Sequence, residues 1–153
     1  MSQLKAGDKA PIFKGIDQNG NSVELTQFSG KKIALYFYPK DDTPGCTAQA
    51  CNLRDNFSEL KEKGIEVIGV STDSMKSHSK FVDKFQLNFP LIADEDKEIV
   101  NQYGVWGLKK FMGREYMGTA RTTFLINEHG LIESIITKPK TNAHAEEIIA
   151  IFK

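Results

Sequence analysis

A buried-strand pattern followed by a helical pattern occurs twice in this chain. Ile33 to Tyr38 is a continuous apolar run of strand length, which is typical of a strand buried on both faces. From Cys46 to Lys63 apolar and small residues recur at intervals of three and four, which predicts a helix. Ile65 to Ser71 repeats the strand pattern, and Ser74 to Phe85 predicts a second helix. Strands that alternate with helices imply a parallel sheet core.

The rest of the chain predicts further elements around this core. They are a strand over Phe89 to Ala93, a helix over Glu95 to Tyr103, an antiparallel hairpin of Thr122 to Asn127 with Leu131 to Thr137, a last helix over Ala143 to Phe152, and an N-terminal edge hairpin within Pro11 to Phe28. A βαβα core followed by a hairpin and a helix is the thioredoxin-like arrangement. We therefore predict an α/β protein with a central mixed sheet flanked by helices, an N-terminal extension, and one domain over residues 1–153.

Cys46 is expected in the first turn of the first helix, where a thiol is activated. Pro39 ends the preceding strand, and the helix start offers unpaired N–H groups and the positive end of the helix dipole, which favour a thiolate. Thr43 offers a hydroxyl for the sulfur or an incoming oxygen, Pro44 fixes φ, and Gly45 allows a close approach. The alternative is an ordinary buried, inert cysteine.

Charge and cysteine content narrow the classes of function. The chain has 20 basic and 20 acidic residues and a formal net charge of zero, so we expect no nucleic-acid partner. The start of the chain lacks an apolar core with a cleavage site, and no apolar stretch is of membrane-spanning length, so we expect a soluble cytoplasmic protein without a membrane partner. In a reducing compartment, two cysteines are more often catalytic, redox-active or metal-binding than structural.

A metal centre is disfavoured, because a closed zinc site needs four ligands and Cys-x4-Cys is too widely spaced. No cofactor is expected. The histidines do not supply the missing ligands or a convincing base, since we expect His78, His129 and His144 all to be solvated surface residues.

Two acidic residues stand close to Cys46. Carboxylates at Asp41 and Asp42 would disfavour a thiolate unless they face solvent or pair with cations such as Lys40. We therefore predict that both point away from the sulfur.

The motif Pro39-x-x-x-Thr43-x-x-Cys46 resembles the active-site motif of the peroxiredoxins. Cys51, five residues after Cys46, is similar to the resolving cysteine of the atypical two-cysteine, Q-type or bacterioferritin comigratory protein subfamily. The resemblance extends over the whole chain. Its other matching segments are Gly7-Asp-Lys-Ala-Pro11, Tyr103-Gly-Val, and Arg121-Thr-Thr-Phe-Leu-Ile126.

The resemblance implies a role for each motif residue. Cys46 would be the peroxidatic cysteine, Thr43 and Arg121 would hold the peroxide and the thiolate, Pro39 would shield the pocket, and Cys51 would be the resolving cysteine. It also implies that the substrates are hydrogen peroxide and organic hydroperoxides, that thioredoxin or a similar dithiol regenerates the enzyme, and that the protein is a monomer.

An acidic thiol does not by itself explain fast peroxide reduction. Lowering a thiol pKa from ~8.5 to ~6 raises the thiolate fraction at neutral pH about 30-fold. A Brønsted slope of roughly 0.4 to 0.5, measured for disulfide exchange, cuts intrinsic nucleophilicity about 10- to 20-fold, so the net gain is about two- to threefold. Most of the catalysis must therefore come from donors fixed around the peroxide, for which Thr43, Arg121 and the Cys46 N–H are the candidates.

The spacing of the two cysteines predicts a conformational change. Residues five apart on a helix have Cα atoms ~8 to 9 Å apart and point about 140° apart around the axis, whereas a disulfide tolerates at most about 7 Å. We therefore expect the first turns to unwind before Cys46, oxidised to a sulfenic acid, bonds to Cys51. The alternative is that Cys51 is a bystander in a one-cysteine enzyme.

Two questions stay open. Trp106, Phe111, Met112 and Met117 lie in the glycine-punctuated segment 104–118, and they either pack in the core and loops or form an apolar collar near Cys46. The alternative functions are a general thiol-disulfide oxidoreductase, which normally carries Cys-x-x-Cys, and a non-enzymatic redox sensor or binding module.

Overall fold

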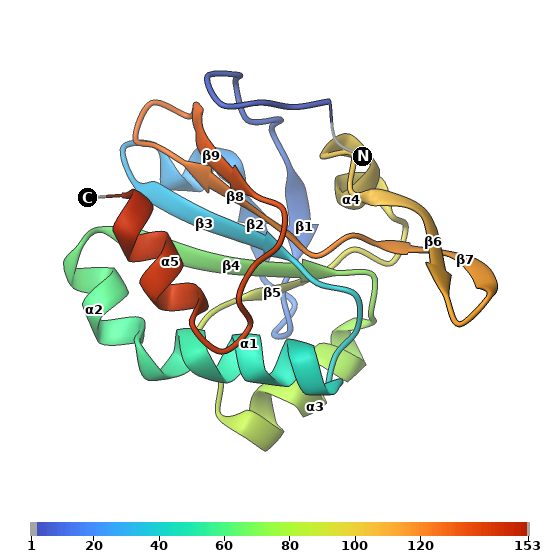
Figure 1. Cartoon of the computed structure of the whole chain (residues 1–153). Coiled ribbons are helices and arrows are strands. Elements are labelled where there is room, and N and C mark those ends of the chain that lie inside the picture. Colours follow the sequence, from blue (N-terminus) through green and yellow to red (C-terminus); the bar gives the residue numbers. More distant parts are fainter. Residues whose placement is uncertain (1–2, 153) are drawn as a thin grey trace.

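A five-stranded mixed sheet forms the centre of the protein, in a computed structural model that describes residues 3–152 (Figure 1). The strands are β3 (Lys32–Phe37), β4 (Ile65–Ser71), β5 (Leu91–Ala93), β8 (Thr122–Ile126) and β9 (Ile132–Ile136). They lie in the order β5-β4-β3-β8-β9, with β3, β4 and β5 parallel and β8 antiparallel to both of its neighbours. The predicted α/β class, parallel core and C-terminal hairpin are confirmed.

Helices and an N-terminal segment cover the two faces of this sheet. Alternate residues of β3 enter different cores: Ala34 and Tyr36 face one layer, and Ile33 and Leu35 face the other. The first layer is covered by α1 (Pro44–Asp55), α2 (Phe57–Glu62), α3 (Met75–Phe85) and α5 (His144–Ile151). The second is covered by α4 (Glu98–Gln102) and the N-terminal segment. The continuous apolar run in β3 thus reflects burial on both faces.

The helix predicted from Cys46 to Lys63 is two helices. Asn56 ends α1 and begins α2, and its side-chain Nδ2 donates to the carbonyl of Asn52 at 2.8 Å. An asparagine side chain that competes for a backbone carbonyl interrupts a helix even where the apolar periodicity continues. Both cysteines remain on α1.

The N-terminal hairpin is confirmed and lies against the edge of the sheet. It consists of β1 (Lys14–Ile16) and β2 (Ser22–Glu24), followed by the 3₁₀ helix η1 (Leu25–Phe28). A Cβ atom on Gly15 would stand 2.4 Å from Ile92 Cγ2 of β5, so only glycine lets the hairpin pack this closely.

A second hairpin projects from the body of the molecule where the sequence predicted no strand. It joins β6 (Trp106–Phe111) to β7 (Arg114–Thr119) (Figure 1). Its turn places Met112 and Gly113 both at positive φ, 51° and 79°. The usual Asn-Gly or Asp-Gly signal for such a turn is absent, and neither face is regularly buried, so the alternation of a half-buried strand is missing as well.

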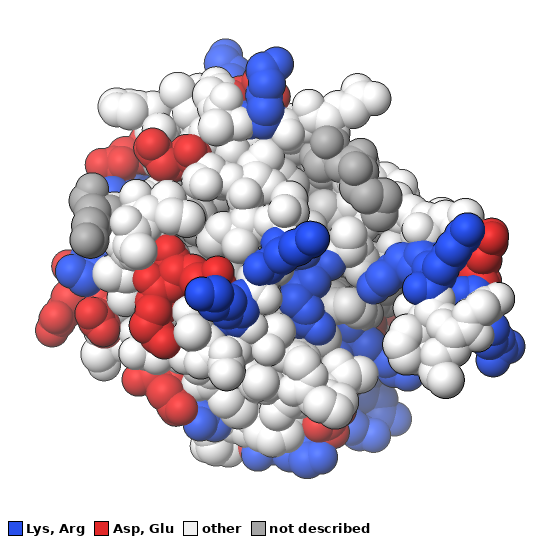
Figure 2. Space-filling view, in the orientation of Figure 1, with Lys and Arg blue, Asp and Glu red and all other residues white. Residues whose placement is uncertain are grey.

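The apolar residues of this hairpin are mostly exposed, which disagrees with the first of the two alternatives, that they pack in the core and loops. Phe111, Met112 and Met117 are exposed, Met112 by 86%, and only Trp106 packs against the core. On the face shown in Figure 2, both signs of charge are spread over the surface, and the hairpin carries charged side chains beside uncoloured ones.

Among residues 3–152, none of the helices combines the length and the apolarity that crossing a bilayer requires.

Candidate active site

Cys46 lies in the first turn of α1, directly after the loop that leaves β3. Thr43 is the N-cap residue, and its carbonyl accepts the N–H of Thr47 at 2.8 Å. The Cys46 N–H precedes this first intrahelical bond, so it belongs to the donors that a helix leaves unpaired at its start. Cys46 is only 1% exposed and packs in the first core layer.

Arg121 reaches the sulfur from the neighbouring strand. It directly precedes β8, which pairs with β3, so its side chain arrives beside the first turn of α1. Its Nη2 donates to Cys46 Sγ at 3.3 Å, and its Nη1 donates to Gln49 Oε1 at 2.7 Å. The predicted proximity of Arg121 and Cys46 is confirmed, so Cys46 has a charged partner although it packs in the core.

Gly45 makes room for this contact. A Cβ atom at that position would lie 3.1 Å from Arg121 Nη2, which is tighter than nine in ten real Cβ contacts, so the guanidinium would have to shift by a few tenths of an ångström. The glycine that precedes the cysteine thus lets the guanidinium lie against the helix start.

Gln49 belongs to the site but was not predicted. Its side chain is buried, its Oε1 orients Arg121, and its Nε2 has no hydrogen-bond partner among the described residues. The available signal was its position, one turn after Cys46 on the same helix face, where a glutamine interrupts the apolar stripe.

Thr43 and Pro39 occupy the loop between β3 and α1. Thr43 Oγ1 donates to the carbonyl of Lys40 at 3.0 Å, so its hydroxyl hydrogen is used within the loop. The prediction that Thr43 donates to the peroxide is therefore wrong for this arrangement, and its lone pairs remain as acceptors. Pro39 is half-buried at the end of β3.

The two acidic residues of the loop are held by partners other than Lys40. The Asp41 carboxylate accepts from Tyr38 Oη at 2.6 Å and Ser77 Oγ at 2.8 Å, and it lies 2.7 Å from His78 Nδ1. Asp42 pairs with Lys84 of α3 at 2.8 Å. Each carboxylate thus has a basic partner on α3, although Asp41 is buried and does not face solvent.

The prediction of three surface histidines is wrong for two of them. His78 and His144 are fully buried, and only His129 is exposed. His78 precedes Phe81 and Phe85 by three and seven residues on the apolar face of α3, a spacing that marked it for burial.

His144 lies 3.1 Å from Glu147 Oε1 through Nδ1 and 2.8 Å from Thr123 Oγ1 through Nε2. In a neutral ring, Nδ1–H donates to the carboxylate and Nε2 accepts from the hydroxyl. Burial lowers the pKa of His144, and this effect outweighs the opposite influence of Glu147.

Two more ionisable side chains lie in the electrostatic field of the site. Burial raises the pKa of Tyr36 well above its ordinary value, and the Cys46 charge adds to this; the Tyr36 hydroxyl has no partner among the described residues. Burial lowers the pKa of Lys109 on β6, and the positive charge of Arg121 lowers it further. The unpredicted hairpin therefore adds a cation near Arg121.

Cys51 lies on the same intact helix as Cys46. It is half-buried, and both thiols are free. Because α1 is intact, the side chains of the two cysteines point in different directions around the helix axis.

The strongest candidate for metal binding in the described part of the chain is a different group of residues. Donor atoms of Asp41, Asp73 and His78 lie within 4.8 Å of one another. These side chains hydrogen-bond within one network, and the 2.7 Å contact between His78 Nδ1 and Asp41 Oδ2 requires a proton where a metal ligand would have none. We therefore assign them to the network and not to a metal centre.

Known proteins share both the sequence and the fold. Residues 6–135 match the AhpC/TSA family. The chain is 50% identical over 149 residues to Peroxiredoxin Bcp of Escherichia coli strain K12, an alignment that covers 97% of this chain and 96% of that protein. It is 48% identical over 149 residues to the putative peroxiredoxin bcp of Haemophilus influenzae, with coverage of 97% and 96%.

Solved structures of similar proteins share the fold of this chain. Peroxidoxin BcpB from Mycobacterium tuberculosis superposes with a TM-score of 0.86 at 32% identity, covering 98% of this chain and 97% of that one. Peroxiredoxin Q from Xanthomonas campestris gives a TM-score of 0.85 at 32% identity, covering 92% and 89%. The chain therefore belongs to the AhpC/TSA family, in its Bcp or Q-type branch, and is a thiol-dependent peroxidase of thioredoxin-like fold.

Proposed function

We propose that Cys46 reduces hydrogen peroxide and organic hydroperoxides through an intramolecular disulfide with Cys51. The Cys46 thiolate attacks one peroxide oxygen, the O–O bond breaks, and the other oxygen leaves as water or alcohol after it takes up a proton. Cys46 is then a sulfenic acid. The Cys51 thiol displaces its hydroxyl as water to form the disulfide, and thioredoxin or a similar dithiol reduces that bond in turn.

The observation that carries this proposal is the 3.3 Å contact between Arg121 Nη2 and Cys46 Sγ. A guanidinium stays charged and presents several donors in a rigid fork, so it can stabilise both the thiolate and the charge on the leaving oxygen. Gln49 fixes its orientation through the 2.7 Å bond. The Cys46 N–H supplies a second donor, since it lies before the first intrahelical bond.

Thr43 and Pro39 complete the proposed peroxide site. The Thr43 hydroxyl, whose hydrogen is bonded to Lys40, accepts the peroxide hydrogen and so sets the direction of the O–O bond. Pro39 shields the thiolate from water. The bacterioferritin comigratory protein of Xanthomonas campestris is 31% identical to this chain and is described as having alkyl peroxide reduction activity. That activity supports organic hydroperoxides as substrates here.

Peroxide titration followed by intact-mass measurement tests the proposal in wild-type protein and in Cys51→Ser. Wild type should lose two hydrogens, and the variant should gain one trappable oxygen. Oxidation of wild-type protein only to the sulfenic acid would remove Cys51 from the cycle. A Cys46→Ser variant should consume no peroxide.

Turnover with thioredoxin distinguishes this cycle from the alternatives. Catalytic peroxide consumption coupled to thioredoxin supports the peroxidase cycle. A single stoichiometric oxidation would indicate a redox sensor, and insulin reduction without peroxide consumption would indicate a general oxidoreductase. From the resemblance to its subfamily we also propose that the protein acts as a monomer, which sedimentation equilibrium tests.

A further inference from the structure

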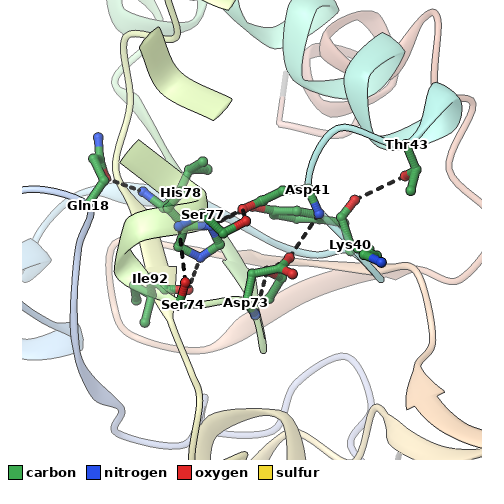
Figure 3. A network of polar contacts seen from close by, with 12 residues as sticks. Gln18, Lys40, Asp41, Thr43, Asp73, Ser74, Ser77, His78 and Ile92 are labelled. Carbon is green, nitrogen blue, oxygen red and sulfur yellow. Dashed lines mark hydrogen bonds and ion pairs between the residues drawn. The ribbon is translucent and has the colours of Figure 1, made fainter. Parts of the chain in front are cut away.

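A buried polar network connects the active-site loop to the end of β3, to α3 and to Asp73, which follows β4. Asp41, in the loop, meets both Ser77 and His78 of α3 (Figure 3). It also accepts a hydrogen bond from Tyr38, which follows β3. Asp41, Tyr38 and His78 are buried. The Asp41 N–H also donates to Asp73 Oδ2 at 2.8 Å, so both the main chain and the side chain of Asp41 are held.

The hydrogen bonds of His78 define its protonation. Its Nε2 lies 2.9 Å from the carbonyl oxygen of Ile92, which can only accept, so Nε2 carries a hydrogen. Its Nδ1 lies 2.7 Å from Asp41 Oδ2. A ring turned by 180° about its axis would face both oxygens with carbon, so only this orientation satisfies them.

The Asp41 carboxylate accepts hydrogen bonds from Tyr38 and Ser77, and its 2.7 Å contact with His78 Nδ1 needs one more hydrogen. We assign that hydrogen to the ring, so that His78 carries hydrogens on both ring nitrogens. The ring is then a buried imidazolium paired with a buried carboxylate.

The charged groups around His78 agree with this assignment. The ionisable side chains that act on the ring are Asp41, Asp73 at 2.8 Å from the Asp41 N–H, and Tyr38 Oη at 3.5 Å from Nδ1. Burial lowers the pKa of His78, but the hydrogen bond and charge of Asp41 outweigh burial, so the pKa lies above its ordinary value of 6.5.

We propose that His78 is a positioning residue for peroxide reduction, held as an imidazolium between Asp41 and the Ile92 carbonyl, and that it fixes the loop that carries Thr43 and starts α1. The proposal rests on the proposed function of Cys46. Asp42, the next residue, sits in the left-handed region at φ 58° and pairs with Lys84, so α3 holds two consecutive loop residues. Thr43 follows immediately and caps the helix that carries Cys46.

The effect on catalysis follows from geometry. The loop has no secondary structure of its own, so its position depends on these contacts. If Asp41 loses its charged partner, a buried carboxylate remains without compensation and the loop moves toward water. A shift of this kind displaces Thr43 and the first turn of α1 relative to Arg121, and misplacement by about 1 Å can cost about 100-fold in rate.

Nitrogen NMR of histidine-labelled wild-type protein near neutral pH tests the protonation. The His78 ring should show two protonated nitrogens, whereas His144, in the same spectrum, should show a proton on Nδ1 alone. Added Zn²⁺ should leave the His78 signals unchanged. A neutral His78 ring, or one whose Nδ1 signal responds to Zn²⁺, would overturn the proposal.

A double-mutant cycle tests the positioning role. His78→Phe should lower the rate constant for Cys46 oxidation by hydrogen peroxide about tenfold, while Asp41→Asn, which can donate to a neutral ring, should stay within about threefold of wild type. In the Asp41→Asn background, His78→Phe should have little further effect, because there is no buried charge left to compensate. Independent effects of the two substitutions would refute the proposal.

Ser74→Ala is the matched control for weakening α3. Ser74 Oγ accepts the Ser77 N–H at 3.0 Å as the helix cap and does not contact Asp41. This variant should lower the urea midpoint of unfolding, because a helix cap is lost, and should leave the oxidation rate unchanged. A rate loss equal to that of His78→Phe would show that the stability of α3 alone matters. If wild-type protein consumes no peroxide, the proposed function fails, whereas the NMR measurement still tests the protonation of His78.

Discussion

We propose that the reactivity of Cys46 depends on one side chain, that of Arg121, which directly precedes β8. Arg121 donates to the sulfur and to Gln49 with different nitrogens, so the guanidinium is oriented before peroxide arrives. A preorganised donor of this kind stabilises developing charge without having to move during the reaction.

Replacing Arg121 with lysine should therefore be costly even though the charge is kept. A single ammonium cannot bond Cys46 and Gln49 in the same fork geometry. We expect the rate constant for Cys46 oxidation to fall about 100-fold, measured by competition for limiting hydrogen peroxide with a second peroxidase. Arg114→Lys, on exposed β7, is the control and should leave the rate unchanged. A lysine variant as fast as wild type would contradict the role of the fork.

The two buried histidines should make stability depend on pH with opposite signs. The folded-state pKa of His78 is raised, so its contribution is present in full below ~6.5 and is lost as the pH rises through the folded value. The folded-state pKa of His144 is lowered, so its contribution is present above ~6.5 and is lost as the pH falls through the folded value. Urea unfolding of wild type, His78→Phe and His144→Phe across this range measures both.

The expected differences are specific. The free energy of unfolding lost in His78→Phe should shrink as the pH rises, and that lost in His144→Phe should shrink as the pH falls. Parallel curves for the two variants would contradict the assigned protonation states.

At the scale of elements, the proposed cycle gives α1 two conflicting tasks. In that cycle α1 is intact when Cys46 meets Arg121, and it unwinds for Cys46 to reach Cys51. Its later turns are tied to α5 through Asn52, whose Oδ1 accepts the Ala145 N–H at 2.7 Å and whose Nδ2 donates to the Asn142 carbonyl at 3.1 Å. Asn52 thus caps the start of α5 from a neighbouring helix.

Asn52→Ala should favour unwinding. Loss of a cap costs about 1 kcal/mol, and if that contact breaks when the Cys51 turn melts, disulfide formation should accelerate by about fivefold. The rate constant for oxidation of Cys46 by peroxide should stay unchanged. Rapid quenching followed by mass spectrometry separates the two steps, and Ser58→Ala on the exposed face of α2 is the control. An unchanged rate of disulfide formation would show that α5 does not restrain α1.

At the scale of the whole molecule, one sheet carries two core layers. Every buried residue of β3 contributes to one layer or the other, so neither layer can form without the central strand. We therefore propose that residues 1–153 form a single cooperative domain.

Unfolding should accordingly be a single transition. Urea curves followed by far-UV circular dichroism and by the fluorescence of Trp106, which packs against the second layer, should coincide. Two separated midpoints would show that the layers unfold independently.

Most of the fold was predictable from local patterns. The strand runs at Ile33 and Ile65, the helix of Cys46 and the hairpin around Gly130 stand where their periodicity placed them. The errors have physical causes: Asn56 breaks a helix through a side-chain bond, and the hairpin from Trp106 to Thr119 lacks the buried face that makes alternation visible.

The chain alone determined which chemistry is available. The sequence around Pro39, Thr43 and Cys46 predicted a thiol at a helix start, and the distance to Cys51 predicts that a disulfide between them needs unwinding, because both inferences follow from local geometry. Tertiary structure decided which groups meet that thiol: Arg121 and Gln49 at the sulfur, and His78 on Asp41. Such pairings join residues far apart in sequence, and only the packing of strands and helices brings them within bonding distance.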